Sequence, residues 1–242
     1  MKTLIFPDLH EPQTSIFRAI EDLIASESPD RIVFLGDYFD RFNDGPDDMM
    51  RTAGWLGDSL KDLRRVHLIG NHDASYLWPC GATFCPGFSW EKEKAFSFVL
   101  GRDSIDRFQF HVVIDGWLLT HAGLSASWVP AGIQPTEIDR WLTSEAEAAR
   151  AAFTENQTHW FLSVGPKRGG RSSAGGILWC DHRELVPVHG LRQIYGHTPD
   201  DCVRWSRKKD GYHVCLDTNQ GRGPQHYAVV IGGSLDVRLL QP

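Results

Sequence analysis

A short apolar run that stops at a glycine and two carboxylates is the strongest constraint on how this chain can fold. Residues 31–35, Arg-Ile-Val-Phe-Leu, are followed by Gly36, Asp37 and Asp40. A short run rich in Val, Ile and Phe that ends in a turn is typical of a buried parallel strand. In open α/β sheets the crevice at the carboxyl ends of the strands holds the ligand. The sequence therefore predicts that Asp37 and Asp40 lie at the rim of a functional site.

The same strand pattern recurs along the chain and alternates with helical segments. Strands are predicted at residues 3–7, 31–35, 66–69, 108–114, 117–120, 193–195, 212–216, 226–231 and 235–240. Helices are predicted between Pro12 and Pro29 and near residues 47–61, 90–100 and 136–162. This order indicates a parallel α/β sheet, with a hairpin at Asp115-Gly116 and an antiparallel meander of three strands in the tail. We expect one domain over residues 1–242, with a site-covering loop at 74–90 and a helical insertion at about 136–162.

Composition narrows the class of protein. The chain has 242 residues, 41% of them hydrophobic, which suits one domain with a sizeable core. A run of about 18 apolar residues is absent, so a membrane-spanning segment is not expected. Five scattered cysteines favour reduced thiols, with Cys80 and Cys85 as an alternative zinc half-site. The apolar run at residues 1–6 is too short for a signal peptide, so we expect a cytoplasmic protein. The net charge of −6 makes nucleic acid an unlikely partner.

Side chains that can bind metals follow the predicted strands one after another. They are Asp8, His10, Asp37, Asn71, His121 and His197. Each has a weak individual case, but six oxygen and nitrogen donors in equivalent places would be an odd coincidence. A mixed set without thiolate favours Mn, with Fe or Zn as alternatives. Because one carboxylate can bridge two ions about 3.5–4 Å apart, and Asp37 lies centrally in the strand series, Asp37 is the natural bridge.

Five ordered motifs resemble those of the calcineurin-like metallophosphoesterases. The motifs are Asp8-x-His10, Gly36-Asp37-x-x-Asp40-Arg41, Gly70-Asn71-His72-Asp73, His121-Ala-Gly123 and Gly196-His197. Gly-Asp-Tyr-Phe-Asp-Arg is close to the form found in the phosphoprotein phosphatase branch, and 178–181 and 216–218 also resemble segments of that branch. The resemblance implies a four-layer α/β/β/α sandwich of two mixed sheets flanked by helices.

The resemblance also implies a role for each matching residue. The first of two divalent metals would be held by Asp8, His10 and Asp37, and the second by Asp37, Asn71, His121 and His197. His72 would be the general acid, oriented by Asp40, and Arg41 would grip the phosphate. Asn71 and a second arginine would also contact the substrate. Arg183 is the first choice for that arginine, ahead of the alternatives Arg192, Arg168 and Arg171.

The chain departs from the family pattern at three positions. Pro7 replaces the small residue usual before the first aspartate, and Glu11 replaces the usual glycine after His10. Neither change removes a ligand. Pro199 stands where many members carry a second histidine, so we expect a water to complete the first metal site.

The resemblance implies a dinuclear-metal phosphoesterase that hydrolyses phosphomonoesters, with a phosphorylated serine/threonine protein as its first candidate substrate. A small phosphorylated molecule is the alternative, in particular a dinucleoside polyphosphate cleaved as by symmetrical diadenosine tetraphosphatases. The aromatic residues of 74–90 either stack a nucleobase or pack under a long loop; they are Tyr76, Trp78, Phe84, Phe88 and Trp90. A non-catalytic metal-binding scaffold is disfavoured because the donors, His72 and Asp40 are all present. A nuclease is disfavoured because the net charge of the chain is negative, whereas proteins that bind nucleic-acid phosphates normally have a basic face.

Overall fold

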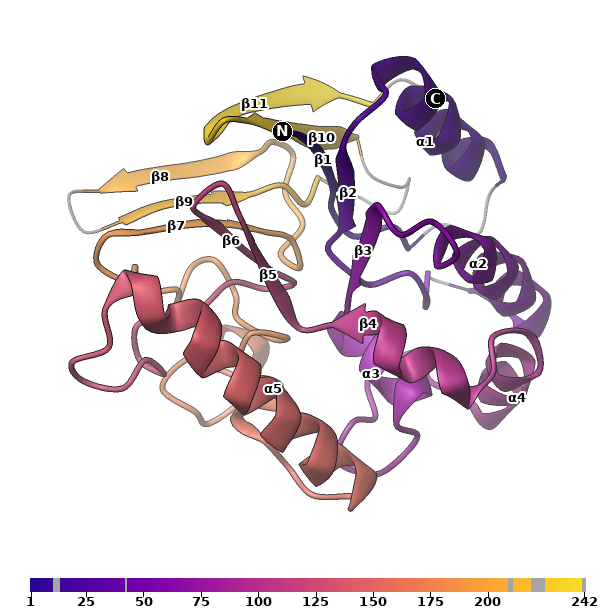
Figure 1. Ribbon diagram of the computed structural model, residues 1–242. Coiled ribbons are helices and arrows are strands. Elements are labelled where there is room, and N and C mark those ends of the chain that lie inside the picture. Colours follow the sequence, from indigo (N-terminus) through magenta and orange to yellow (C-terminus); the bar gives the residue numbers. More distant parts are fainter. Residues whose placement is uncertain (11–13, 42, 209–210, 219–224, 241–242) are drawn as a thin grey trace.

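Two mixed β-sheets packed face to face form the centre of this computed structural model, with helices on their outer sides (Figure 1). The structure describes residues 1–10, 14–41, 43–208, 211–218 and 225–240. The first sheet has the order β11 (Ser234–Leu239), β10 (His226–Ile231), β1 (Lys2–Phe6), β2 (Arg31–Phe34), β3 (Arg65–Leu68) and β4 (Phe108–Gln109). The second has the order β5 (His111–Ile114), β6 (Trp117–Thr120), β7 (Leu191–Tyr195), β9 (Gly211–Cys215) and β8 (Arg204–Lys208).

Five α-helices are described: α1 (Thr14–Glu27), α2 (Pro46–Ser59), α3 (Asn71–Leu77), α4 (Trp90–Val99) and α5 (Ile138–Thr154). Short 3-10 segments occur at η1 (Arg102–Arg107), η2 (Pro135–Glu137), η3 (Trp160–Leu162) and η4 (Pro166–Arg168). Helices α1, α2 and α4 lie together beside the first sheet, and α5 contacts β5 of the second (Figure 1). Within these residues, every helix is too short or too polar to cross a bilayer.

The strands of the first sheet are apolar on both faces because each face is covered. In β1, Leu4 and Phe6 belong to the core formed with the helices, whereas Ile5 belongs to the core between the two sheets. Successive strand residues point to opposite faces, so this alternation is the one that a doubly covered strand requires. In α1, Ile16 and Ile20 lie one turn apart and are buried against the same outer core.

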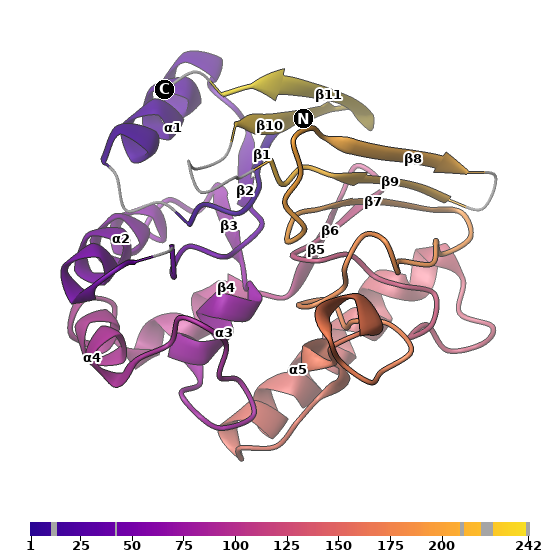
Figure 2. The same ribbon diagram turned by 180° about the vertical axis from the view of Figure 1, so that it is seen from behind.

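Parallel pairing brings the ends of several strands to one edge of each sheet. In the first sheet β1, β2 and β3 are parallel, and in the second β6, β7 and β9 are parallel. Tyr195 of β7 pairs with Cys215 of β9, so His197 and Asp217 each lie two residues beyond the same level. The loops after these strand ends meet in the region between the two sheets (Figure 2).

Two sequence predictions about strands are wrong. The run 108–114 is not one strand: it divides at the buried Phe110 into β4 of the first sheet and β5 of the second, because the chain crosses between sheets there. The tail is not one meander either. Strand β9 pairs with β7 and with the unpredicted edge strand β8, whereas β10 and β11 extend the first sheet. The hairpin at Asp115-Gly116 is confirmed, with φ of 48° and 76° at its two turn residues.

The predicted loop 74–90 and helix 136–162 also differ from the structure. Residues 71–77 form α3, whose Tyr76 is buried, so the connecting segment is shorter than predicted. Helix α5 ends at Thr154, and a separate 3-10 turn follows at 160–162. Glu11, one of the positions at which the chain departs from the family pattern, lies outside the described residues.

Candidate metal centre

Side chains that follow five strands, three of the first sheet and two of the second, line one cavity of about 330 Å³. The cavity is lined by Asp8, His10, Asp37, Asp40, Arg41, Asn71, His72, Pro86, Arg168, Trp179, His197, Pro199 and Asp217. His121 follows β6 directly and is fully buried beneath this cavity, within reach of the lining donors. The six donors predicted from the sequence are therefore neighbours in space.

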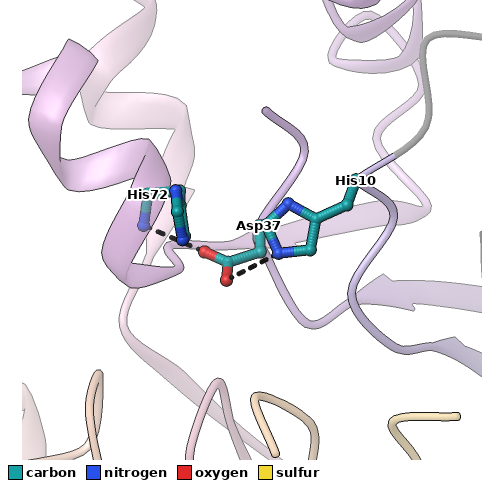
Figure 3. A group of neighbouring side chains, drawn as sticks. All are labelled: His10, Asp37 and His72. Carbon is teal, nitrogen blue, oxygen red and sulfur yellow. Dashed lines mark hydrogen bonds and ion pairs between the residues drawn. The ribbon is translucent and has the colours of Figure 1, made fainter. Parts of the chain in front are cut away.

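Asp37 lies at the centre of the group. Its Oδ2 is 3.2 Å from Nε2 of His10 and 3.4 Å from Nε2 of His121. Its Oδ1 accepts a hydrogen bond of 3.0 Å from the backbone N–H of His72. Figure 3 shows the side chains of His10 and His72 on either side of this carboxylate. One carboxylate thus contacts His10, which follows a strand of the first sheet, and His121, which follows a strand of the second.

A second set of contacts meets at Nε2 of His121. This atom is 3.0 Å from Oδ1 of Asn71 and 3.1 Å from Nδ1 of His197. The other ring nitrogen donates to the carbonyl oxygen of Leu35 at 2.9 Å, since a carbonyl can only accept. Nε2 is therefore the ring atom of His121 that faces Asn71 and His197. Nδ2 of Asn71 donates to Sγ of Cys85 at 3.4 Å, which holds that amide in this orientation.

The electrostatics of the cavity reflect close packing of carboxylates and imidazoles. Burial would lower the pKa of His10, but the carboxylate of Asp37 raises it to about 9. Burial would raise the pKa of Asp37, but His121, His72 and His10 hold it well below its usual range. Burial, and then Asp217 and Asp37, raise the pKa of Asp8.

The residues fit a pair of cations that share Asp37. Two groups have ligand atoms within 4.8 Å of one another: His10, Asp37 and His72, and Asp37, His121 and His197. Nε2 of His197 is buried and has no hydrogen-bond partner among the described residues. Burial and the neighbouring His121 lower the pKa of His197 well below its usual range, which keeps the ring neutral as metal ligation requires. Nitrogen and oxygen donors without a thiolate are the set expected for Mn, Fe or Zn.

Backbone strain is concentrated at the same residues. His10, Asp37, Asp40 and His197 have φ between 37° and 71°, the left-handed region that side chains with a Cβ rarely adopt. Such conformations cost free energy and persist where the surrounding contacts determine them, most often at functional sites.

Two glycines allow the loops after β2 and β3 to lie against each other. Gly36 has φ of 100°, and a Cβ on it would be 2.4 Å from the backbone N of Gly70. A Cβ on Gly70 would be 2.0 Å from Oδ1 of Asp37. Asp73 joins the two loops, since its Oδ2 accepts from the N–H groups of Asp37 at 2.7 Å and Gly70 at 2.8 Å. These contacts place Asp37 and Asn71 on one wall.

His72 and Asp40 form a hydrogen-bonded pair beside the donors. Nδ1 of His72 is 3.1 Å from Oδ2 of Asp40, so Nε2 is left to face other groups. Burial would raise the pKa of Asp40, but hydrogen bonding to His72, Lys92 and Tyr76 lowers it, and the carboxylate stays ionised.

The arginines are distributed differently from the sequence-based order of preference. Arg41 and Arg168 line the cavity, but Arg183, the first choice, does not. The guanidinium of Arg183 is exposed and donates to both carboxylate oxygens of Asp181, at 2.8 and 2.7 Å. Arg168 is half-buried and donates to the carbonyl oxygen of His197 at 2.9 Å. Of the other two candidates, Arg192 bonds to backbone carbonyls beyond the cavity and Arg171 is exposed and does not line it.

Sequence reasoning did not assign several residues that the structure places in or around the cavity. Asp217 lines it and hydrogen bonds to Asp8. It follows β9 at the spacing at which His197 follows β7, so the strand-end rule could have identified it. Trp179, which the sequence offered only as part of the resembling segment 178–181, lies edge-on to His197 at 5.6 Å. Lys92 pairs with Asp40, and no sequence signal pointed to it. Cys80 and Cys85 are free thiols, and the metal-competent groups of the described residues contain neither.

Solved structures with the same fold include two phosphatases. One, from a psychrophilic Shewanella species, is described as a cold-active protein-tyrosine phosphatase; it is 16% identical, with a TM-score of 0.59, over 99% of this chain and 80% of that one. Another, from Saccharomyces cerevisiae, is described as a protein serine/threonine phosphatase similar to human PP5; it is 15% identical, with a TM-score of 0.52, over 100% of this chain and 80% of that one. At these identities the likeness shows the fold alone. No curated protein sequence matches significantly.

The family model for calcineurin-like phosphoesterases matches residues 1–211, which include all five motifs. The two mixed sheets flanked by helices and the metal-competent groups around Asp37 agree with that match. The chain belongs to the calcineurin-like phosphoesterase family and is a metal-dependent phosphoesterase.

Proposed function

We propose that this protein hydrolyses phosphomonoesters and that its substrate is a protein phosphorylated on serine or threonine. The observation that carries the proposed hydrolysis is the convergence on Asp37 of donors from both sheets, with the His72–Asp40 pair at their side. The choice of substrate is supported by the resemblance of residues 36–41 to the phosphoprotein phosphatase branch. The first cation would be held by Asp8, His10 and Asp37, and the second by Asp37, Asn71, His121 and His197. Bound there, two divalent cations would polarise the phosphoryl group and supply hydroxide near neutral pH.

The chain's own residues would bind the phosphate and move the proton. Arg41 and Arg168 line the cavity from different loops, so their guanidinium groups can bind the phosphoryl oxygens from two directions. We propose Arg168 in place of Arg183, because Asp181 holds the latter outside the cavity. Protonated His72 would donate a proton to the leaving oxygen as the P–O bond breaks, and the ionised Asp40 would stabilise that imidazolium.

The test of the metal requirement and of the substrate uses a panel of esters. We expect full loss of activity with a chelator, recovery with Mn²⁺, and the highest kcat/KM for a phosphoserine or phosphothreonine peptide. The panel also contains diadenosine tetraphosphate and a simple diester. A preference for either of these would refute the proposed substrate, and activity that survives complete removal of metal would refute the two-cation centre.

The proton donor is tested by the His72→Asn variant. We expect turnover of an alkyl phosphate to fall by about 10²–10⁴-fold while the metal content stays nearly normal. Full activity of the variant on that substrate would show that His72 is not the acid. A p-nitrophenyl ester serves as the comparison, because its leaving group needs little protonation.

A second candidate function is hydrolysis of a dinucleoside polyphosphate, favoured by an exposed aromatic cluster beside the cavity. Phe84 and Phe88 stack at 4.4 Å, and Trp90 lies edge-on to both. Phe84 and Trp90 are 44% and 53% exposed, and Pro86, between these residues in sequence, lines the cavity. Exposed rings of this kind can stack a nucleobase. If they do, replacing Phe84 and Trp90 by alanine raises KM for diadenosine tetraphosphate and leaves KM for the phosphopeptide unchanged. If variant and wild type have equal KM values for diadenosine tetraphosphate, the rings have a packing role only.

A further inference from the structure

A buried lysine contacts the carboxylate that holds His72. The side chain of Lys92, in the first turn of α4, is 9% exposed, and its ammonium group forms an ion pair with Oδ1 of Asp40. Tyr76 donates its hydroxyl proton to the same oxygen at 2.6 Å. The other oxygen of Asp40 is left for Nδ1 of His72, at 3.1 Å. A lysine is seldom buried to this extent without a partner, so the pairing defines its place.

The contacts come from separate elements and hold Asp40 from several sides. Tyr76 is on α3, Lys92 is on α4, and Asp40 follows β2 with a strained φ of 66°. The side-chain oxygen of Ser89 accepts from the backbone N–H of Lys92 at 3.3 Å and fixes the start of α4. Gly87 packs so closely that a Cβ there would lie 2.9 Å from Cβ of Asp40.

We infer that Lys92 and Tyr76 are positioning residues of the reaction, which fix the Asp40 carboxylate so that it orients His72 toward the leaving oxygen. Neither residue lines the cavity, so both act through Asp40 rather than on the substrate. With Oδ1 occupied by two donors, rotation of the carboxylate would break two hydrogen bonds, and Oδ2 stays directed at the imidazole. The inference rests on the proposed role of His72 as the proton donor.

The competing explanation is that Lys92 only neutralises a buried carboxylate and stabilises the fold. Loss of stability would lower the amount of folded enzyme, and hence the rate, equally for every substrate. Loss of a well-placed proton donor lowers the rate only where the leaving group needs a proton. The dependence of the rate on the leaving group therefore separates the two explanations.

The experiment compares Lys92→Met, Lys92→Arg and Tyr76→Phe with wild type and with Lys94→Met, all loaded with Mn²⁺. Lys94 is the matched control, because it is exposed on the same helix. For Lys92→Met we expect kcat on β-glycerophosphate to fall about 100-fold, and kcat on p-nitrophenyl phosphate to change less than about fivefold. Metal content and KM should be unchanged, Lys92→Arg should keep most of the activity, and Lys94→Met should match wild type.

An equal loss on both substrates, or no loss on either, would overturn the inference. If Lys92→Met does not fold, Tyr76→Phe decides, because it removes one hydrogen bond and keeps the ring: a loss of about tenfold confined to β-glycerophosphate supports the inference and equal kcat ratios overturn it. His72→Asn is measured in parallel. If that variant shows no leaving-group dependence, the proposed proton donor fails; if it does and the Lys92 and Tyr76 variants do not, the positioning role alone fails.

Discussion

Replacing Gly196 by alanine should damage the metal centre through a clash with Asp8. Gly196 lies between β7 and His197, and its φ is outside the left-handed region, so alanine can adopt its conformation. The added Cβ would lie 2.3 Å from Oδ2 and 3.0 Å from Cγ of Asp8. The Asp8 carboxylate cannot turn away freely, because its Oδ1 accepts the N–H of His197 at 2.5 Å.

The size of the effect follows from that contact. An ordinary van der Waals contact begins at 3.4 Å, so the Asp8 oxygen must move by about 1 Å or the strand ends must separate. Overpacking of this kind typically costs about 1–3 kcal/mol of unfolding free energy. A displacement of about 1 Å in a catalytic group lowers the rate by about 100-fold. We therefore expect both a lower unfolding free energy and weaker binding of the cation held by Asp8.

The assay measures bound metal by elemental analysis, kcat/KM on a phosphomonoester, and unfolding in urea. Gly54→Ala is the matched control: Gly54 is inside α2, a Cβ there meets nothing within 4 Å, and alanine should stabilise the helix by about 0.5–1 kcal/mol. Activity of that variant should equal wild type. The reasoning would be refuted if Gly196→Ala kept two ions per chain, wild-type affinity for them and wild-type kcat/KM.

Two further predictions test the substrate cavity and the core. Arg168→Met should lower kcat/KM by about 100-fold through loss of a charged donor, whereas Arg183→Met should change it by less than about threefold because its ion pair is exposed; the reverse order would restore the original preference for Arg183. His67 is buried, and burial followed by the nearby Arg65 and Arg107 lowers its pKa to about 3. Between about pH 6.5 and 3 the unfolded chain binds a proton there and the folded chain does not, so unfolding free energy should fall on acidification by up to about 1.4 kcal/mol per pH unit. Urea unfolding of His67→Gln should show a correspondingly weaker fall, and an unchanged slope would contradict this.

The donors could be predicted from the sequence because each one follows a strand, and the hydrophobic pattern of a strand involves only a few consecutive residues. A run such as 31–35 predicts both a buried strand and its end. The rule that parallel strand ends share an edge then brings Asp37 near Asn71 in the first sheet and His121 near His197 in the second. The same rule applies to Asp217, which the sequence reading quoted only as part of a resemblance. The hairpin at 115–116 was predictable for the same local reason.

The residues that the sequence could not assign depend on contacts between distant segments. Lys92 is one of two lysines in α4, and it is buried only because α4 packs against α2 and places its ammonium group beside Asp40. Which arginine enters the cavity was decided by Asp181, whose ion pairs hold Arg183 outside and Arg168 at the rim. The division of 108–114 between two sheets is equally non-local, since an alternating apolar run does not state which strand it will pair with.

The sequence by itself determined the class of chemistry. Metal ligands must be particular side chains, and here each one can be recognised from the few residues of the strand that precedes it. Tertiary structure alone decided which groups surround the predicted donors: which ammonium group pairs with Asp40, which guanidinium lines the cavity, and which further carboxylate hydrogen bonds to Asp8. The physical reason is that a charge is buried or left exposed by the neighbours that packing brings to it, and packing is a property of the whole chain.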